Sequence, residues 1–150
     1  MRAVLQRVLR ARVTVAGETV GKIGPGLLAL VAVGKHDGPA DLEYLERRLR
    51  DLRIFRGERG HFDRSLVEVG GELLLVSQFT LFGDVRRGRR PDFSGAAPGT
   101  SAQELFEQLA ARLRASGLPV ATGRFGADMQ VELANDGPVT LWLDSRGDGT

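Results

Sequence analysis

The sequence contains no cysteine, and this absence excludes a disulfide framework, a thiol nucleophile and a thiolate metal site. Its two histidines, His36 and His61, are too sparse and too isolated to form a three-ligand metal site. No apolar run approaches the roughly 20 residues that span a bilayer, and the N-terminal segment lacks the apolar core of a signal peptide. We therefore expect a cytoplasmic protein that has no membrane segment and no metal.

The chain is also short of lysine. Only Lys22 and Lys35 are lysines, so the other 19 of the 21 basic residues are arginines, which favour bidentate contacts with phosphate. The net charge is nevertheless only +2, so the charge balance permits a nucleic-acid partner without requiring one. A chain of 150 residues suits a single domain that buries roughly 70% of its unfolded surface.

Apolar patterning predicts several strands with two helices between them. The strands are expected at 4–15, 19–23, 27–33, 54–55, 67–69, 72–76, 120–125, 129–133 and 139–143. One helix is expected to start near Pro39, and a second to run from Ser101, in a capping box with Glu104, to a cap at Gly117. This order predicts an α+β domain over 1–144 with a strongly curved, mostly antiparallel sheet, followed by a flexible tail at 145–150.

A functional site is expected at the end of the stretch 73–81. Its apolar part, expected to form a hairpin with 67–69, passes directly into the polar sequence Ser77-Gln78-Phe79-Thr80. A strand that served only the core would continue in Val, Ile or Leu. Hydroxyls, an amide and backbone N–H groups at a strand end are typical of a site on a rigid scaffold. A solvated strand end is the simpler interpretation of these residues taken alone.

A mobile basic loop is expected shortly after this stretch. Four arginines, Arg86, Arg87, Arg89 and Arg90, stand there beside glycine, proline and phenylalanine. A charge run of this kind is usually a solvated face. Its closeness in sequence to the expected site also suits contacts with a phosphate backbone.

Serine-hydrolase chemistry has little support in the sequence. No serine lies in a Gly-x-Ser-x-Gly elbow, because Ser77 is flanked by Val76 and Gln78. An enzyme with this sequence must therefore work through polar groups, backbone amides and its own substrate.

Two motifs together resemble the pair that defines the D-aminoacyl-tRNA deacylases: Ser77-Gln78-Phe79-Thr80-Leu81 and Asn135-Asp136-Gly137-Pro138-Val139-Thr140. The likeness extends over 2–8, 52–55, 90–93 and 126–129, and so covers nearly the whole chain. The resemblance implies a homodimeric enzyme with a barrel-like fold that hydrolyses the ester between a D-amino acid and the 3′-terminal ribose of tRNA. It also implies glycyl-tRNA as a substrate, and neither a metal nor an organic cofactor.

The resemblance places the catalytic groups at Ser77, Gln78, Phe79 and Thr80. Ester hydrolysis needs a placed nucleophile and donors aimed at the developing oxyanion, for which the backbone N–H groups of Gln78 and Phe79 are candidates. Thr80 is a candidate nucleophile, but a hydroxyl needs an activating base and the motif contains no His, Lys or carboxylate. We therefore favour attack by water assisted by the ribose 2′-hydroxyl, with Thr80 positioning the substrate.

Substrate-binding roles are implied for six further residues. Gly137 and Pro138 would form a cis peptide whose carbonyls enter the partner subunit's pocket and exclude L-amino acids, whereas composition alone makes 134–138 an ordinary turn between strands. Arg7 would brace this motif. Met129 would line an adenine pocket or, alternatively, the core. The last two, which would contact phosphates, are Arg86 and Arg87.

A second class of function remains open at this point. The basic loop alone would also suit a non-catalytic module that binds tRNA or another RNA. Such a binder would leave the ester of an aminoacyl-tRNA intact, whereas a deacylase would release the amino acid.

Overall fold

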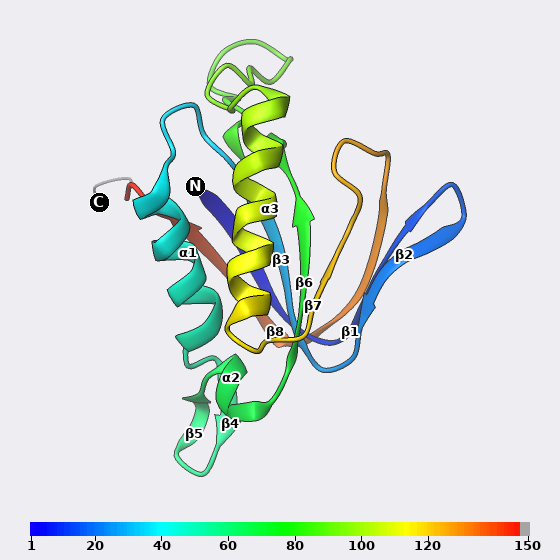
Figure 1. Cartoon of the computed structure of the whole chain (residues 1–150), viewed down its shortest axis with the longest axis vertical. Coiled ribbons are helices and arrows are strands. Elements are labelled where there is room, and N and C mark those ends of the chain that lie inside the picture. Colours follow the sequence, from blue (N-terminus) through cyan, green and yellow to red (C-terminus); the bar gives the residue numbers. More distant parts are fainter. Residues whose placement is uncertain (148–150) are drawn as a thin grey trace.

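The computed structural model describes residues 1–147, which are arranged around β1 (Arg2–Val15). Along one edge, β1 pairs antiparallel first with β3 (Gly26–Ala32) and then with β2 (Glu18–Ile23). Along the other edge, β8 (Gln130–Asp144) pairs antiparallel with almost the whole of β1. The antiparallel pairings of the six-stranded sheet therefore all share β1 (Figure 1).

Two further strands extend this sheet beyond β3, and both are parallel to their neighbour. β6 (Glu72–Ser77) pairs with β3, and β7 (Val120–Thr122) pairs with β6. In each case a long helix lies between the paired strands in sequence, which is the crossover that parallel strands require. The expected hairpin of 67–69 with 72–76 is therefore wrong, because 72–76 pairs across the sheet with β3.

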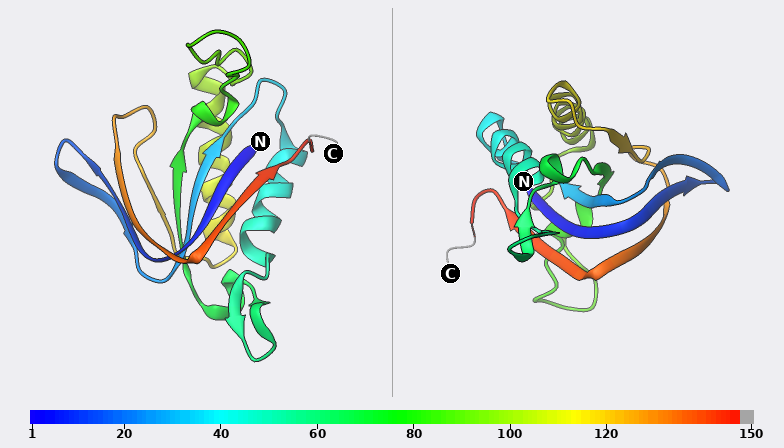
Figure 2. Two further views of the ribbon diagram at one scale, coloured as in Figure 1. Left: turned by 180° about the vertical axis from the view of Figure 1, so that it is seen from behind. Right: turned by 90° about the horizontal axis from the view of Figure 1, so that it is seen from below.

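The sheet curls until β2 meets β7. A Cβ atom on Gly21 of β2 would lie 2.4 Å from the carbonyl oxygen of Thr122 at the end of β7, so only glycine permits this approach. The curl is visible in the two views of Figure 2. The expected single α+β domain with a barrel-like sheet is confirmed, with a mixed sheet whose antiparallel pairings gather on β1.

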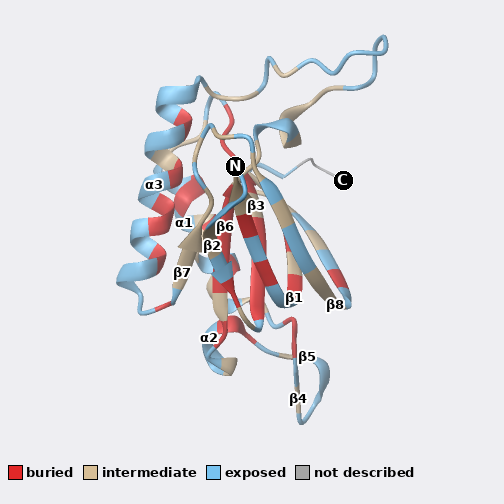
Figure 3. Cartoon of the chain, turned by 90° about the vertical axis from the view of Figure 1, so that its right-hand side faces the viewer, coloured by how far each residue is buried: buried red, intermediate tan, exposed pale blue. Residues whose placement is uncertain are grey.

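The two long helices lie side by side on one face of the sheet (Figures 1 and 2). α1 (Pro39–Asp51) and α3 (Gly99–Ala115) each bury one apolar face against the strands, as the buried positions in Figure 3 show. The buried side chains include Leu45 and Leu49 of α1 and Leu109 of α3, none of which is exposed to solvent. The helical spacing of apolar residues predicted both helices correctly.

Smaller elements differ from the expectation. Residues 66–69 form the short helix α2 (Leu66–Val69), because Ser65 and Glu68 make a capping box and Gly70, at φ +63°, ends the turn. The capping box expected at Ser101 is wrong. α3 starts earlier, with Pro98 as its N-cap, and the Ser101 hydroxyl donates to the Pro98 carbonyl.

A small two-stranded hairpin, β4 (Phe55–Gly57) and β5 (Gly60–Arg64), projects beyond α1 (Figure 1). A 3₁₀ helix, η1 (Phe79–Phe82), follows β6. None of the helices within residues 1–147 is both long and apolar enough to cross a membrane.

β8 is one continuous strand where a strand, a turn and a second strand were expected. Gln6 pairs with Thr140 and Val8 with Asn135, so residues 136–139 lie opposite Arg7 alone. The turn predicted at 134–138 is therefore wrong: β1 supports the chain on both sides of these residues, and the extra length is taken up as an irregularity within the strand.

The C-terminal segment is held against the start of the chain. Ser145 donates its backbone N–H to the Met1 carbonyl, and its hydroxyl bonds Asp41. Arg146 makes ion pairs with Asp37 and Asp41. The rest of the expected tail, residues 148–150, lies outside the described residues.

Candidate functional site

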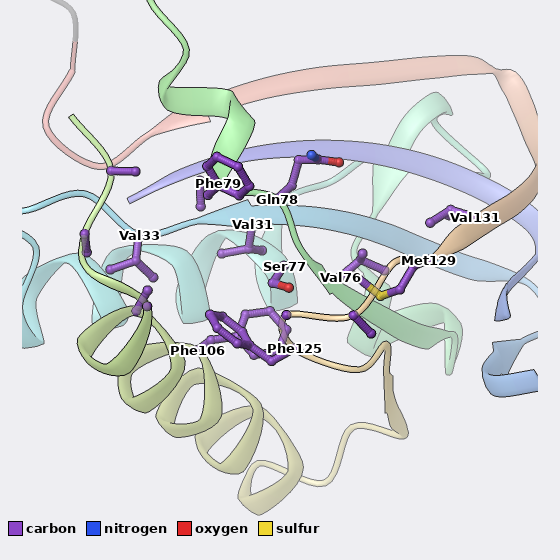
Figure 4. Close-up of a pocket in the computed structure, with 17 residues that line it drawn as sticks. Val31, Val33, Val76, Ser77, Gln78, Phe79, Phe106, Phe125, Met129 and Val131 are labelled. Atoms are coloured by element: carbon purple, nitrogen blue, oxygen red, sulfur yellow. The ribbon is translucent and has the colours of Figure 1, made fainter. Parts of the chain in front are cut away.

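A cavity of about 500 Å³ opens where the parallel strands β3 and β6 end, beside the first turns of α3. Four of the predicted site residues line it: Ser77, Gln78, Phe79 and Met129. The remaining lining is apolar and comes from residues 31–33, the end of β6, residues 96–97, the first turns of α3 and residues 125–131. Figure 4 shows Ser77 near the rings of Phe106 and Phe125, with the sulfur of Met129 nearby. The strand end singled out from the sequence therefore lines this cavity.

The backbone at the strand end carries free N–H groups, although not the pair that was expected. Gln78 donates its N–H to the Val31 carbonyl at 2.8 Å, which fixes the end of β6 against β3 and removes this donor. The first N–H groups of a helix have no intrahelical acceptor. Those of Phe79 and Thr80, at the start of η1, have no acceptor within residues 1–147. The available donors are therefore Phe79 and Thr80.

The side chains of the motif contain no base. Gln78 donates its amide N–H to the Thr80 hydroxyl, and the Phe79 ring packs edge-on against Phe93 with centroids 5.1 Å apart. Within residues 1–147, neither Ser77 nor Thr80 is hydrogen-bonded to a His, Lys or carboxylate. The same residues contain no cluster of three or more His, Asp or Glu side chains able to hold a metal ion.

Two aromatic residues of the cavity were not predicted as site residues. Phe106 belongs to the apolar face of α3, and Phe125 was included in a strand that in fact ends at Thr122. Their ring centroids lie 6.1 Å apart. The signal that would have pointed to Phe125 is its place directly before the 126–129 segment, which contains Met129.

The second motif is organised by Arg7, whose side chain is only 3% exposed. Its Nε donates to the Asp136 carbonyl at 3.1 Å, and its Nη1 donates to the Ile54 carbonyl at 2.7 Å. The Asp136 carboxylate also lies 3.3 Å from Nε and is bonded by Arg56. The hydrogen bonds from Arg56, and then the charges of both guanidinium groups, lower the pKa of Asp136 below its usual value. Arg7 thus contacts the motif that it was expected to brace.

The Gly137-Pro138 bond is cis, and both residues are exposed. Gly137 has φ +128°, a value that L-residues with a side chain rarely adopt. A Cβ atom there would also come within 3.0 Å of the Arg7 guanidinium and 2.9 Å of a Val139 methyl group. This position therefore requires glycine.

The two motifs do not meet within one chain. Through the registers of β1, β3 and β6, Arg7 is level with Leu73 at the start of β6, whereas Ser77 is level with Ala3. The offset from Ala3 to Arg7 is four residues, or roughly 13 Å along the strands. β8 and β6 are in addition separated by β1 and β3, a lateral distance of roughly 14 Å.

The basic loop joins η1 to α3 and is closed at its neck by two backbone hydrogen bonds between Asp84 and Asp92. Arg86 is not free: its guanidinium and its N–H hold the Asp84 carboxylate and lower the pKa of Asp84 to about 2. Arg87 and Arg89 are exposed and have no ion-pair partner within residues 1–147. The expected phosphate-binding pair Arg86 and Arg87 therefore contains one engaged and one available cation.

Comparison with known proteins agrees with the family resemblance that the two motifs indicated. A family model described as D-Tyr-tRNA(Tyr) deacylase matches residues 4–144. A D-aminoacyl-tRNA deacylase from Kineococcus radiotolerans is 59% identical over 97% of this chain and 100% of its own length. One from Heliobacterium modesticaldum is 57% identical over 98% of both chains.

Solved structures share the fold of this chain. One titled c-Myc DNA Unwinding Element Binding Protein is 41% identical and has a TM-score of 0.90, covering 96% of this chain and 98% of its own. Another, titled as a probable eukaryotic D-amino acid tRNA deacylase, has a TM-score of 0.81 at 20% identity over 95% and 97% of the two chains, and so shows the fold.

The family model and the relatives that match over nearly their full length thus place this chain among hydrolases of the deacylase class. This chain belongs to the D-aminoacyl-tRNA deacylase family, and the resemblance drawn from its two motifs is confirmed.

Proposed function

We propose that this protein hydrolyses the ester of D-aminoacyl-tRNA, and also that of glycyl-tRNA, as a proofreading step that spares L-aminoacyl-tRNA. The observation that carries this proposal is the pair of unengaged N–H groups of Phe79, which lines a largely apolar cavity, and of Thr80, which follows Phe79 in η1. An ester is already reactive, so donors placed at its developing oxyanion supply a large part of the catalysis.

The cavity suits the terminal adenosine of tRNA. Its apolar walls and the aromatic rings of Phe106 and Phe125 fit a flat base, and Met129 supplies an adaptable thioether beside them. With the base in this part of the cavity, the ribose and its ester reach the strand end at Ser77 and η1. A non-polar lining is also what a ligand site of this size usually has.

The hydrolysis then proceeds by attack of water on the ester carbonyl carbon. The ribose 2′-hydroxyl hydrogen-bonds the attacking water, and the N–H groups of Phe79 and Thr80 stabilise the tetrahedral oxyanion. Collapse of this intermediate breaks the bond to the 3′-oxygen, which receives, through the 2′-hydroxyl, the proton given up by the attacking water, and releases the free amino acid. The Thr80 hydroxyl, bonded by Gln78, positions the substrate and forms no covalent intermediate.

A homodimer completes the site. Gly137 and Pro138 are exposed and lie far from Ser77 in the same chain, so they act on the cavity of a partner subunit. Backbone carbonyls presented there block the direction of an L side chain and leave room for different D side chains, since rejection needs only an obstruction. Glycine has no side chain to obstruct and is accepted.

The direct test is incubation of the protein with matched D- and L-tyrosyl-tRNA. Release of D-tyrosine with retention of the L-ester supports the proposal. A non-catalytic tRNA-binding module, favoured only by the arginines of the loop, would retain both esters while shifting tRNA in a gel.

Subunit complementation tests the shared site. Ala102→Trp is expected to fill the cavity, and Gly137→Ala to displace the second motif, so each homodimer should lose most of its D-tyrosyl-tRNA activity. Random heterodimers of the two variants contain one intact site, and coexpression should restore about a quarter of the wild-type activity. Failure of the coexpressed pair to recover activity, with both variants folded and dimeric, would contradict a site built from two chains.

Substitution in the basic loop should change binding and its salt dependence. The double variant Arg87→Ala with Arg89→Ala is expected to raise KM for D-tyrosyl-tRNA. It should also reduce the slope of log KM against log salt concentration by about 1.4 to 1.8, the value for two lost phosphate contacts. Arg86→Ala, which removes a cation already held by Asp84, should have the smaller effect. KM measured between 50 and 200 mM salt tests this prediction. An effect of Arg86→Ala on KM that equals or exceeds that of the double variant would contradict the assignment of phosphate binding to Arg87 and Arg89.

A further inference from the structure

A second depression, of about 330 Å³, adjoins the cavity. Phe106 and Phe125 line both hollows, and Figure 4 shows their rings together beside α3. The depression lies between α3 and residues 122–125, the segment that follows β7. The two hollows are therefore adjoining parts of one path along α3.

The walls of this depression are charged, unlike those of the cavity. Arg114 donates from Nε and Nη2 to the Val120 carbonyl, both at 3.3 Å, which orients its guanidinium and leaves Nη1 available. Arg124 is exposed, and its side chain has no hydrogen bond or ion pair with any residue from 1 to 147. One carboxylate, Glu107, is also present and accepts a hydrogen bond from Gln103 at 3.0 Å. Two cations thus face one anion.

We propose that this depression binds the phosphodiester and the nucleotide that precede the terminal adenosine, with Arg124 and Arg114 on the phosphate. The proposal rests on the proposed function, which seats the terminal adenosine in the adjoining cavity. A strand that leaves the cavity through its 5′-phosphate must continue along the protein surface, and the adjoining hollow offers guanidinium groups suited to phosphate. The Phe125 ring at the boundary offers a face on which a base can stack.

Two substrates separate this subsite from the rest of the site. D-Tyrosyl-tRNA carries the upstream phosphodiester, whereas 3′-O-(D-tyrosyl)adenosine carries the same ester and nucleoside without it. Arg124→Ala is expected to raise KM for the tRNA about tenfold, the size of a lost hydrogen bond to a charged group, and to leave kcat unchanged. KM for the adenosine ester should change by less than about twofold, because that substrate does not reach the depression.

Three further variants make the test specific. Arg124→Lys should recover part of the affinity, since it restores the charge without the planar fork. Glu107→Gln should lower KM for the tRNA, because it removes a charge that repels phosphate. This change in KM is opposite in direction to the one expected for Arg124→Ala. Arg47→Ala removes an exposed arginine of α1 outside the depression and should leave KM unchanged for both substrates.

An equal rise in KM for both substrates would overturn the proposal, because it would mean that Arg124 only supports the wall of the adenosine cavity. Unchanged KM for both would show that Arg124 is merely solvated, and would overturn it as well. Failure of the wild-type protein to hydrolyse either ester would refute the proposed function and the subsite together. If the wild-type protein hydrolyses both esters and the variants have the same KM as the wild type, the subsite alone is refuted.

Discussion

Replacing Arg7 with leucine is expected to lower the free energy of unfolding by about 3–5 kcal/mol, because two carbonyls lose a buried, charged donor at a cost of about 1–3 kcal/mol each. The substitution leaves the Asp136 carbonyl and carboxylate and the Ile54 carbonyl without their buried donor. For a chain of this size the midpoint of thermal unfolding should fall by roughly 10 °C. Urea titration measures the change in the free energy of unfolding, and a thermal melt measures the change in the midpoint.

Arg56 provides the matched control, because it bonds the same Asp136 carboxylate from a side chain that is 53% exposed. Arg56→Leu should cost only about 0–1 kcal/mol, as exposed ion pairs usually do. Arg7→Lys should fall between the two, since an ammonium cannot reproduce the fork that spans two carbonyls. Similar losses for Arg7→Leu and Arg56→Leu would show that burial of Arg7 does not govern the stability of this motif.

Removal of the 2′-hydroxyl from the terminal ribose is expected to slow hydrolysis of D-tyrosyl-tRNA by about 10² to 10⁴, the usual range for loss of a proton-transfer group. The reason is the absence of a base beside Ser77 and Thr80 within residues 1–147. Single-turnover rates with a 2′-deoxyadenosine-terminated tRNA, aminoacylated at the 3′-position, would measure the loss.

Thr80→Ala is the companion to this experiment. It removes the hydroxyl but keeps the backbone N–H, so we expect a reduction of less than about tenfold and no burst of released tRNA. A covalent acyl group trapped on Thr80, or a deoxy substrate cleaved at the normal rate, would contradict substrate assistance.

Much of the fold could be predicted because local patterns and tertiary packing agree. The leucines of α1 recur at helical spacing and are all buried, and the apolar run 27–33 became the central strand β3. Strand pairing could not be predicted, because continuous apolar runs such as those of β3 and β6 suit any buried strand, and their parallel pairing depends on the crossover through α1. The short helix α2 was missed although its Ser65–Glu68 capping box was present, since Gly70-Gly71 looked like a hairpin turn.

The site could be predicted in part for the same reason. Polar residues at the end of an apolar strand located Ser77 and its neighbours at the cavity. Which backbone N–H groups are available at the strand end could not be predicted. The hydrogen bond from the Gln78 N–H to the Val31 carbonyl exists only once β3 and β6 are paired. Nor could the sequence show that Gly137 lies within an uninterrupted strand, since turn composition is the same whether or not β1 supports it.

β1 also limits where this chain can change in length. The residues from Ala3 to Arg7 connect the level of Ser77 to the level of Gly137, so this strand fixes the spacing between the cavity motif and the exposed Gly137-Pro138 motif. A single inserted residue there would turn every following side chain to the opposite face and bring Arg7 out of the core. Insertions should instead collect at the tip of the β4–β5 hairpin and in the basic loop, where added residues leave that spacing unchanged.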